Sequence, residues 1–449
     1  MRYTPHTASD KEYLLKAIGL NRIEELFSHI PQTLKDQASI SLPPGLTEVE
    51  VRKKMAALAV RNGTPEDWSL FLGGGIYHHA IPSTVDAVIS RAEFATAYTP
   101  YQPEVSQGTL QAAYEYQTLI CQLTGMEVSN AGLYDGASGT AEAVLMARRI
   151  QKRRNRVFVS RALHPQYRLV IATHLKNLEK TEIVEIPFTD AGQMDIEFLS
   201  KEMDERAICV VVGYPNFFGA IEDLAPLREA CARHGVLLIS VTTEALSLAL
   251  LKPPGFWGVD IAVGEGQSLG LPMSLGGPGY GFFACQKKLV RTMPGRLVGE
   301  TEDTEGRRGF VLTLATREQH IRREKATSNI CTTQTLCTLA STVFMATLGK
   351  GGMRRLAEAN VARAHETRGR LVKDARLVPT FGAPFFNEFV LNVKGLTKVL
   401  SRFESKRIVP GIPLKPWYPE LGEGLLICVT EMNEREEIDR LVETFSGNG

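Results

Sequence analysis

The sequence predicts an α/β protein with a mainly parallel sheet, and three observations lead to that prediction. Between residues 110 and 285, short apolar runs alternate with helical stretches. The runs are rich in Val and Ile and apolar on both faces, which is typical of parallel strands covered by helices on both sides. The chain has 449 residues, 44% of them hydrophobic, so about two or three domains with at least one large core are expected.

The predicted elements follow in chain order. Residues 1–70 are expected to form an N-terminal helical arm, because apolar residues such as Leu14, Ile18 and Phe27 fall on one helix face. Residues 71–340 form the large α/β domain, with predicted helices at 110–124, 138–152, 165–178, 194–204 and 224–234 and predicted strands at 156–160, 181–188, 207–215, 236–242, 260–264 and 280–285. Residues 341–449 are expected to form a small α+β domain that begins with a long helix at 353–375.

Composition and charge argue against several classes of function. The chain has 51 Lys and Arg against 50 Asp and Glu, whereas a nucleic-acid binder needs a positive surplus, so no nucleic acid is expected as a partner. An apolar run of about 18 residues is lacking, so no membrane is expected either. The N-terminus does not read as a secretory signal, and the seven cysteines form neither a CxxC pair nor a zinc pattern. We therefore expect a cytoplasmic protein with reduced thiols and no metal.

Turns after the apolar runs hold candidate pocket residues, because ligands of open α/β sheets bind at the carboxyl ends of the strands. Ser138, Gly139 and Thr140 start a helix after a turn rich in Gly and Ser, where N–H groups and hydroxyls suit a phosphate; a capped helix is the alternative. His164 either stacks on a planar ring or caps the next helix, and Asn216 lies in a turn as a possible polar ligand.

Two further segments combine polar, aromatic or charged residues in irregular stretches. The segment 98–108, YTPYQPEVSQG, holds two Tyr, two Pro and one Glu and is costly to order unless it packs into an interface or site; a loop packed on its own domain is the alternative. The stretch 307–334 combines basic residues with Thr, Ser and Asn, which indicates either a salt-bridged face or a phosphate or partner contact.

Taken together, these segments resemble the glycine cleavage system P-protein family, glycine dehydrogenase (decarboxylating), and specifically its subunit 1. The motifs in chain order are IPQTLK, GGGIYHHAIP, YTPYQPEVSQG, YDGASGTAEA, HPQY, YPNFFG, LGGPGYG and EKATSNICTTQ. Several long motifs in a fixed order are far more specific than any one alone, and they cover nearly the whole chain. The resemblance implies the aspartate-aminotransferase-like fold, fold type I of the pyridoxal phosphate (PLP) enzymes.

The resemblance also implies which residues should hold PLP, namely a lysine for covalent attachment and an acid at the pyridine nitrogen. The lysine position corresponds to Gln267, and no Lys occurs between Lys252 and Lys287. The acid position corresponds to Thr242; Glu244 is near, but a one-residue slip reverses the direction of a strand side chain. We therefore expect no catalytic residue on this chain alone, and a relic cofactor pocket formed by Ser138, Gly139, Thr140, His164 and Asn216.

A partner follows from the same resemblance, because fold type I active sites lie at subunit interfaces. The chain is expected to complete the site of a homologous catalytic subunit 2 in an α2β2 assembly, with PLP bound covalently by that partner. In the implied reaction glycine is decarboxylated and its aminomethyl group passes to the lipoyl arm of the H-protein. The residues expected to reach the partner's PLP and glycine are Tyr98, Thr99, Tyr101, Gln102, Glu104, Ser106, Thr327, Ser328 and Asn329.

Charge alone suggests a docking place for the H-protein, since Arg322, Arg323 and Lys325 could receive an acidic surface. Hydroxyl and backbone N–H groups at Thr327 could bind the phosphate of the partner's cofactor. Two alternative functions stay open: an independently active PLP decarboxylase or transaminase that uses Lys325, and a non-catalytic regulatory or scaffold protein.

Overall fold

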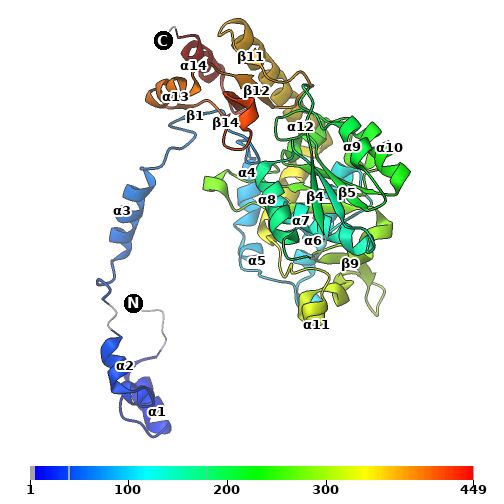
Figure 1. Cartoon of the computed structure of the whole chain (residues 1–449). Coiled ribbons are helices and arrows are strands. Elements are labelled where there is room, and N and C mark those ends of the chain that lie inside the picture. The colour runs from blue at the N-terminus through cyan, green and yellow to red at the C-terminus, as the bar shows by residue number, and fades with distance from the viewer. Residues whose placement is uncertain (1–5, 39–40, 179–180, 448–449) are drawn as a thin grey trace. The chain divides into compact units, whose positions relative to one another are not determined.

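The computed structural model describes residues 6–38, 41–178 and 181–447 (Figure 1). The chain divides into two compact units, residues 1–63 and 64–449. Residues 1–5 and 39–40, which belong to the predicted arm, lie outside the described residues.

The first unit consists of short helices and loops. Its elements are α1 (Ala8–Ala17), the 3-10 helix η1 (Ile23–Phe27), α2 (Gln32–Gln37) and α3 (Glu48–Ala59). α1 begins with a capping box between Thr7 and Asp10, and α3 with one between Thr47 and Glu50. None of the described residues of this unit is buried, so local caps hold these helices without a hydrophobic core of their own.

The second unit is built around a mainly parallel sheet, which confirms the predicted α/β class. In its described part the sheet has seven strands in the order β2-β8-β7-β6-β5-β3-β4. The strands are β2 (Val128–Ser129), β3 (Arg156–Ser160), β4 (Glu182–Ile186), β5 (Ala207–Gly213), β6 (Leu237–Thr242), β7 (Ile261–Glu265) and β8 (Gly281–Cys285). Strands β4, β3, β5, β6 and β7 run parallel, whereas β8 pairs antiparallel with both β7 and β2.

Helices cover both faces of this sheet, which explains the continuous apolar runs in the sequence. The helices are α6 (Gln107–Thr124), α7 (Gly136–Ile150), α8 (Pro165–Leu175), α9 (Ile196–Glu202) and α10 (Leu224–His234). Consecutive residues of β6 illustrate the two layers: Leu238 belongs to the hydrophobic cluster that includes residues of α6, α9 and α10, whereas Ile239 belongs to the cluster that includes residues of α7 and α8. Every residue of β3, β5, β6, β7 and β8 is therefore buried.

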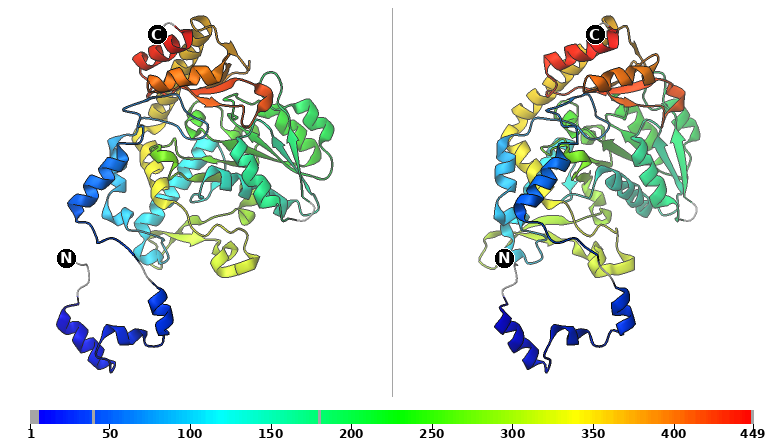
Figure 2. Two further views of the ribbon diagram at one scale, coloured as in Figure 1. Left: turned by 60° about the vertical axis from the view of Figure 1, so that its left-hand side comes forward. Right: turned by 90° about the vertical axis from the view of Figure 1, so that its left-hand side faces the viewer.

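A smaller antiparallel sheet follows near the C-terminus, in the order β11-β12-β15-β14. Its strands are β11 (Val378–Pro379), β12 (Glu388–Asn392), β14 (Ile412–Pro413) and β15 (Gly424–Cys428), and α13 (Leu396–Ser405) and α14 (Arg435–Ser446) pack with it. Figure 2 shows these orange and red elements together at one end of the second unit. The rings of Phe403 and Phe445 join the two helices with centroids 4.5 Å apart.

The longest helix differs from its prediction. The expected helix at 353–375 is α12 (Thr335–Lys373), which begins eighteen residues earlier and bends at Gly349, where φ is +59°. Its first part, including Ala340 and Phe344, is buried on nearly all sides against α4 (Ser83–Ile89), α6 and the sheet. A helix that is apolar all round lacks the amphipathic period that marks a surface helix, so the sequence pattern does not reveal it.

The remaining elements connect these layers. β1 (Ser69–Leu70) pairs with β13 (Ile408–Val409), and β9 (Leu297–Glu302) forms a hairpin with β10 (Arg308–Thr313). Short helices occur at α5 (Ala92–Ala95), α11 (Gln319–Arg322), η2 (Pro103–Val105), η3 (Ala245–Ala249), η4 (Pro254–Trp257), η5 (Ser274–Gly276), η6 (Lys287–Thr292), η7 (Ala315–Arg317), η8 (Arg323–Lys325) and η9 (Pro419–Leu421). The predicted boundary between the large and the small domain, at residue 340, falls inside α12. The division of the chain at that residue stays a prediction.

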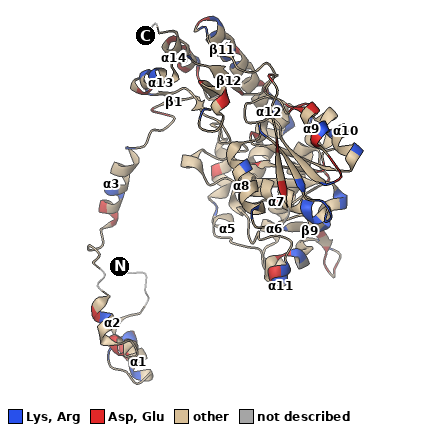
Figure 3. Ribbon diagram, in the orientation of Figure 1, with Lys and Arg blue, Asp and Glu red and all other residues tan. Residues whose placement is uncertain are grey.

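Acidic and basic residues are interspersed along the elements (Figure 3). No helix within the described ranges is long and apolar enough to cross a bilayer. In the same ranges, no three His, Cys, Asp or Glu side chains gather as metal ligands would.

Candidate functional site

A pocket of about 480 Å³ lies beside the N-terminus of α7. It is lined by the turn Asp135–Ser138, by His164, by Glu265 and Gln267 after β7, and by residues 74–76 and 276–279. The structure thus brings Ser138 and His164 together, as predicted for the relic pocket. Most lining residues follow the carboxyl end of a strand, which is where ligands of α/β sheets bind.

Three predicted pocket residues do not line it. Gly139 is packed inside α7, where an added Cβ would lie 2.8 Å from a methyl group of Val263. The Thr140 hydroxyl donates to the carbonyl of Gly136 at 2.7 Å, within the same helix. Asn216 is buried and donates to the carboxylate of Glu222 at 2.7 Å. The Thr140 and Asn216 side chains are satisfied within the protein, and a contact of any of the three residues with a ligand stays a prediction.

The N-terminus of α7 is the place predicted for a phosphate, but carboxylates of the chain already bind there. The amide of Gly136 donates to Glu265 Oε2 at 2.9 Å, and the amide of Ser138 donates to Asp135 Oδ1 at 2.6 Å. The other oxygen of Glu265 accepts from the amide of Tyr280 at 3.0 Å. Burial raises the pKa of Glu265 to about 7. Internal carboxyl groups therefore occupy the amides of Gly136 and Ser138, which leaves these two donors unavailable to a phosphate dianion.

Gln267 is fully used as a clamp between two backbone segments. Its amide nitrogen donates to the carbonyls of Tyr77 at 2.9 Å and Leu271 at 2.7 Å. Its amide oxygen accepts from the amide of Tyr77 at 2.8 Å. The side chain is buried, so it fixes the segment 73–79 against the glycine-rich stretch after β7. An amide cannot form a Schiff base, and no lysine lines the pocket.

His164 caps the next helix, which is one of the two roles that the sequence left open for it, and stacking on the planar ring of a ligand stays a prediction. Its Nδ1 accepts from the amide of Gln166 at 3.2 Å and so caps α8, while Nε2 donates to the carbonyl of Gly74 at 2.7 Å. Burial lowers the pKa of His164 to about 4, so the ring is neutral at pH 7. The ring packs against those of Phe217 and Tyr167, with centroids 4.8 and 4.9 Å away, and an added Cβ on Gly75 would lie 3.5 Å from Nε2.

The position predicted for the acid is occupied by a buried threonine. The Thr242 hydroxyl donates to the carbonyl of Tyr214 at 2.9 Å. Glu244 points elsewhere: it accepts from His79 Nε2 at 3.0 Å. His79 Nδ1 in turn bonds to Glu431 at 2.9 Å. Burial favours neutral His79, but the two carboxylates outweigh that effect and raise the pKa of His79 to about 10.

The residues of this pocket do not fit PLP. A lysine is missing, the donors at α7 are bonded to carboxylates, and the segment 73–79 is fixed against Gln267 and His164. The sequence did not single out Tyr77, His79, Glu388 and Glu431, which form two hydrogen-bonded pairs, Tyr77 with Glu388 and His79 with Glu431; all but the half-buried Glu431 are buried. The motif GGGIYHHAIP pointed to this segment, but its partners Glu388 and Glu431 lie more than 300 residues away in the chain.

The residues predicted to reach a partner lie at the surface of the second unit. Tyr98 and Tyr101 are 72% and 68% exposed. Gln102, Glu104 and Asn329 are also exposed, and Thr99, Ser106, Thr327 and Ser328 are partly buried. The amide of Thr327 donates to the carbonyl of Arg317 at 2.9 Å, so the expectation that this N–H binds a phosphate is corrected. Arg322, Arg323 and Lys325 are exposed on α11 and η8.

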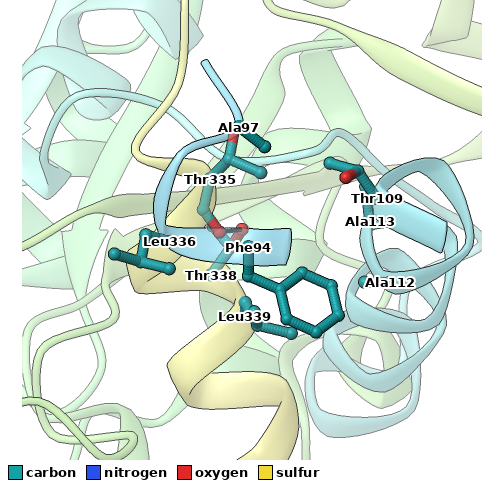
Figure 4. A pocket seen from close by; sticks show the side chains of 9 residues that line it. All are labelled: Phe94, Ala97, Thr109, Ala112, Ala113, Thr335, Leu336, Thr338 and Leu339. Atoms are coloured by element: carbon teal, nitrogen blue, oxygen red, sulfur yellow. Dashed lines mark hydrogen bonds between the residues drawn. The ribbon is translucent and has the colours of Figure 1, made fainter. Parts of the chain in front are cut away.

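Residues next to the segment 98–108 and next to the segment that contains Thr327 line a small cavity between α5, α6 and α12. Figure 4 shows Phe94 of α5 beside Ala112 of α6 and Leu339 of α12, with Ala97 and Thr335 above. Ala97 and Thr109 flank the segment 98–108, and Thr335 follows the second segment. The cavity measures about 20 Å³, enough for about one water molecule. It is therefore a packing site between the two segments and not a substrate pocket.

The fold defines the class of the protein: it has the fold of the fold type I PLP-dependent enzymes. Sphingosine-1-phosphate lyase of Burkholderia pseudomallei has a TM-score of 0.66 at 16% identity and covers 91% of this chain and 92% of that chain. Cysteine desulfurase of Thermococcus onnurineus has a TM-score of 0.64 at 14% identity, covering 91% of this chain and 99% of that one. At such identities the likeness concerns the fold alone.

The chain belongs to the glycine cleavage system P-protein family, whose sequence profile matches residues 1–445. The probable glycine dehydrogenase (decarboxylating) subunit 1 of Carboxydothermus hydrogenoformans is 48% identical over 449 residues, covering 100% of both chains. The subunit 1 of Anaeromyxobacter dehalogenans is 49% identical over 450 residues, covering 100% of this chain and 99% of the relative. An inhibitor-bound crystal structure of glycine decarboxylase (P-protein) of the glycine cleavage system matches with a TM-score of 0.91 at 42% identity, covering 100% of both chains. The predicted family is thereby confirmed.

Proposed function

We propose that this chain is the subunit of a heteromeric glycine decarboxylase that carries no PLP of its own and completes the active site of a homologous partner. Its similarity over full length to proteins named subunit 1 supports a partner subunit. The observation that carries the proposal is the pair of internal carboxylates, Glu265 and Asp135, bonded to the amides at the N-terminus of α7.

Electrostatics explains why PLP would bind to the partner. A phosphate dianion beside α7 would have to displace Glu265 from the amide of Gly136 and Asp135 from the amide of Ser138, and would face these acidic groups at close range. The Gln267 side chain, bonded three times to the backbone, supplies no amine to which PLP could be attached. PLP held covalently by a catalytic subunit 2, in an α2β2 assembly, would supply the electron sink for decarboxylation of glycine.

The contribution of this chain would come from its two exposed segments. Tyr98, Thr99, Tyr101, Gln102, Glu104 and Ser106, together with Thr327, Ser328 and Asn329, would present hydroxyl, amide and carboxylate groups to the partner's substrate and cofactor. The exposed cations Arg322, Arg323 and Lys325 would attract the lipoylated H-protein through an acidic surface. A cytoplasmic location agrees with the seven cysteines, all of which are free.

Reduction with borohydride tests where PLP is attached. The chain alone, incubated with PLP and borohydride, is expected to show no pyridoxyl-lysine by mass spectrometry, and glycine-dependent CO2 release should appear only when the catalytic subunit is added. A reduced adduct on this chain would support an independent PLP enzyme. Full activity of the catalytic subunit alone would support a scaffold role.

Two variants test the contributed residues. Tyr101→Phe and Thr327→Ala are each expected to lower kcat/KM of the complex roughly tenfold, the loss of one hydrogen bond to a charged group, without dissociating it. Thr173→Ala is the control, because this exposed hydroxyl bonds only to the carbonyl of Leu169 within α8. Unchanged turnover in both variants would remove Tyr101 and Thr327 from the site.

A further inference from the structure

Arg296 links the two exposed segments from below. It precedes β9, and only 6% of it is exposed. Nη2 donates to the carbonyl of Cys331 at 2.8 Å, and Nη1 approaches the Thr99 hydroxyl at 3.4 Å. Its guanidinium carbon lies 6.0 Å from the ring centroid of Tyr101. One side chain therefore touches both segments, which are more than 200 residues apart in sequence.

Contacts of the backbone and of the side chain hold the guanidinium of Arg296 in place. The carbonyl of Arg296 accepts from the amide of Ala131 at 2.9 Å, so its backbone is fixed beside the edge strand β2. Glu318 Oε2 lies 3.7 Å from Nε and offsets the charge. Neither Nε nor Glu318 Oε1 has a hydrogen-bond partner among the described residues. A buried ion pair with such incomplete bonding is a poor source of stability, which suggests that it is needed for another purpose.

The chemistry of arginine fits a bridging role. The guanidinium carries five N–H donors in a rigid planar fork, so it can bond to two segments in different directions and stack on an aromatic ring at once. A lysine at the same place would direct one flexible ammonium group at a single acceptor. The second segment has its own support nearby, because the carbonyl of Arg317 accepts from the amide of Thr327.

We propose that Arg296 is a positioning residue that holds the segments 98–108 and 326–334 in register for the partner's active site. The proposal rests on the proposed function, since it assumes that these segments reach a partner. Displacement of such groups by about 1 Å can cost roughly a hundredfold in rate even when the altered residue is far from the reacting atoms. Arg296 would act only through Thr99, Tyr101 and the Cys331 backbone.

Kinetics of the complex with the catalytic subunit provide the first test. Arg296→Lys is expected to lower kcat for glycine-dependent CO2 release roughly 10- to 100-fold, while the affinity between the subunits changes by less than about threefold. Arg291→Lys makes the same replacement at an exposed position on η6 and should leave kcat unchanged. A normal kcat for Arg296→Lys would overturn the proposal.

A double variant with a change at Thr99 tests whether Arg296 acts through that residue. Thr99→Val should lower kcat less than Arg296→Lys does, and the double variant should be no worse than Arg296→Lys alone, because both changes break the same contact. Effects that multiply in the double variant would show that Arg296 does not act through Thr99.

Hydrogen exchange of the full chain without its partner gives a readout that needs no activity. Arg296→Lys should speed amide exchange in peptides that cover both 98–108 and 326–334, whereas Thr99→Val should speed it in the first only. Acceleration in one segment or neither in Arg296→Lys would overturn the bridge. If Arg296→Lys does not fold, Thr99→Val still tests the link by both readouts.

The activity of the catalytic subunit with the wild-type chain distinguishes failure of the proposed function from failure of the Arg296 proposal. A wild-type chain that does not raise the activity of the catalytic subunit would refute the proposed function and this inference with it. A wild-type chain that does, combined with normal kinetics and exchange in Arg296→Lys, would refute this inference only.

Discussion

His79 is held between two carboxylates in the interior of the second unit. Glu244 follows β6, Glu431 follows β15, and Asn360 of α12 donates to Glu431 at 2.7 Å. Burial alone would favour the neutral ring, yet the two acids raise the pKa of His79 to about 10. At neutral pH a charged imidazolium thus joins the large sheet to elements of the small one. A single residue performs this task because its two nitrogens donate in opposite directions.

Substitution of His79 is expected to change the pH dependence of stability. The folded-state pKa, about 10, lies above the ordinary value of 6.5, so the folded chain retains a proton that the unfolded chain loses between these values. The stabilisation is fully present below about pH 6.5 and is lost as pH rises towards 10. His79→Gln should therefore melt lower than wild type at about pH 6, with a smaller difference at about pH 9.

Thermal melts at several pH values measure this difference. His234→Gln, at the exposed end of α10, is the matched surface control and is expected to melt like wild type. If the melting curves of His79→Gln and wild type stay parallel across the range, His79 is not protonated in the folded chain.

The segment 73–79 lines the pocket and is held there by hydrogen bonds to three side chains. Gln267, His164 and Glu388 each bond to it, the last through the amide of Gly74 at 2.6 Å and the Tyr77 hydroxyl at 2.9 Å. Burial raises the pKa of Glu388 to about 7. These side chains come from three different parts of the chain. The segment 73–79 therefore connects those parts across the carboxyl edge of the sheet.

Removal of the Gln267 clamp is expected to destabilise the chain. Gln267→Ala would leave the buried amide and carbonyl of Tyr77 and the carbonyl of Leu271 without their partner, a loss of about 2–4 kcal/mol. Urea denaturation should show a lower midpoint with the same slope. Gln122→Ala, exposed on α6, is the control. A midpoint like that of wild type would mean that Gln267 is not a structural clamp.

At the scale of the molecule, the two units differ in how they are stabilised. The second unit has a large core on both faces of its sheet. The first has none among its described residues, although Tyr13, Ile18, Val49 and Met55 are large, apolar and more than half exposed. Short helices without tertiary packing are marginally stable in water, because the free-energy cost of nucleation exceeds the gain from a few helical turns.

A peptide of residues 1–63 is therefore expected to be largely unfolded on its own. Far-UV circular dichroism should show weak helicity that rises in trifluoroethanol. The segment 64–449 expressed alone should in contrast unfold cooperatively, since its core is internal to it. A cooperative thermal transition in the isolated 1–63 peptide would contradict this expectation.

The sequence by itself determined the α/β class, most of the strands, the family and the absence of a lysine between Lys252 and Lys287. These features depend on local periodicity and on motif order, which can be read along one dimension. Only the tertiary structure decided that Glu265 binds the amide of Gly136, that Gln267 clamps Tyr77, that His79 lies between Glu244 and Glu431, and that Arg296 spans two segments. The partners in these pairs are separated by 35 to 352 residues. Their meeting depends on how helices and sheets pack, and no local pattern of the chain records that packing.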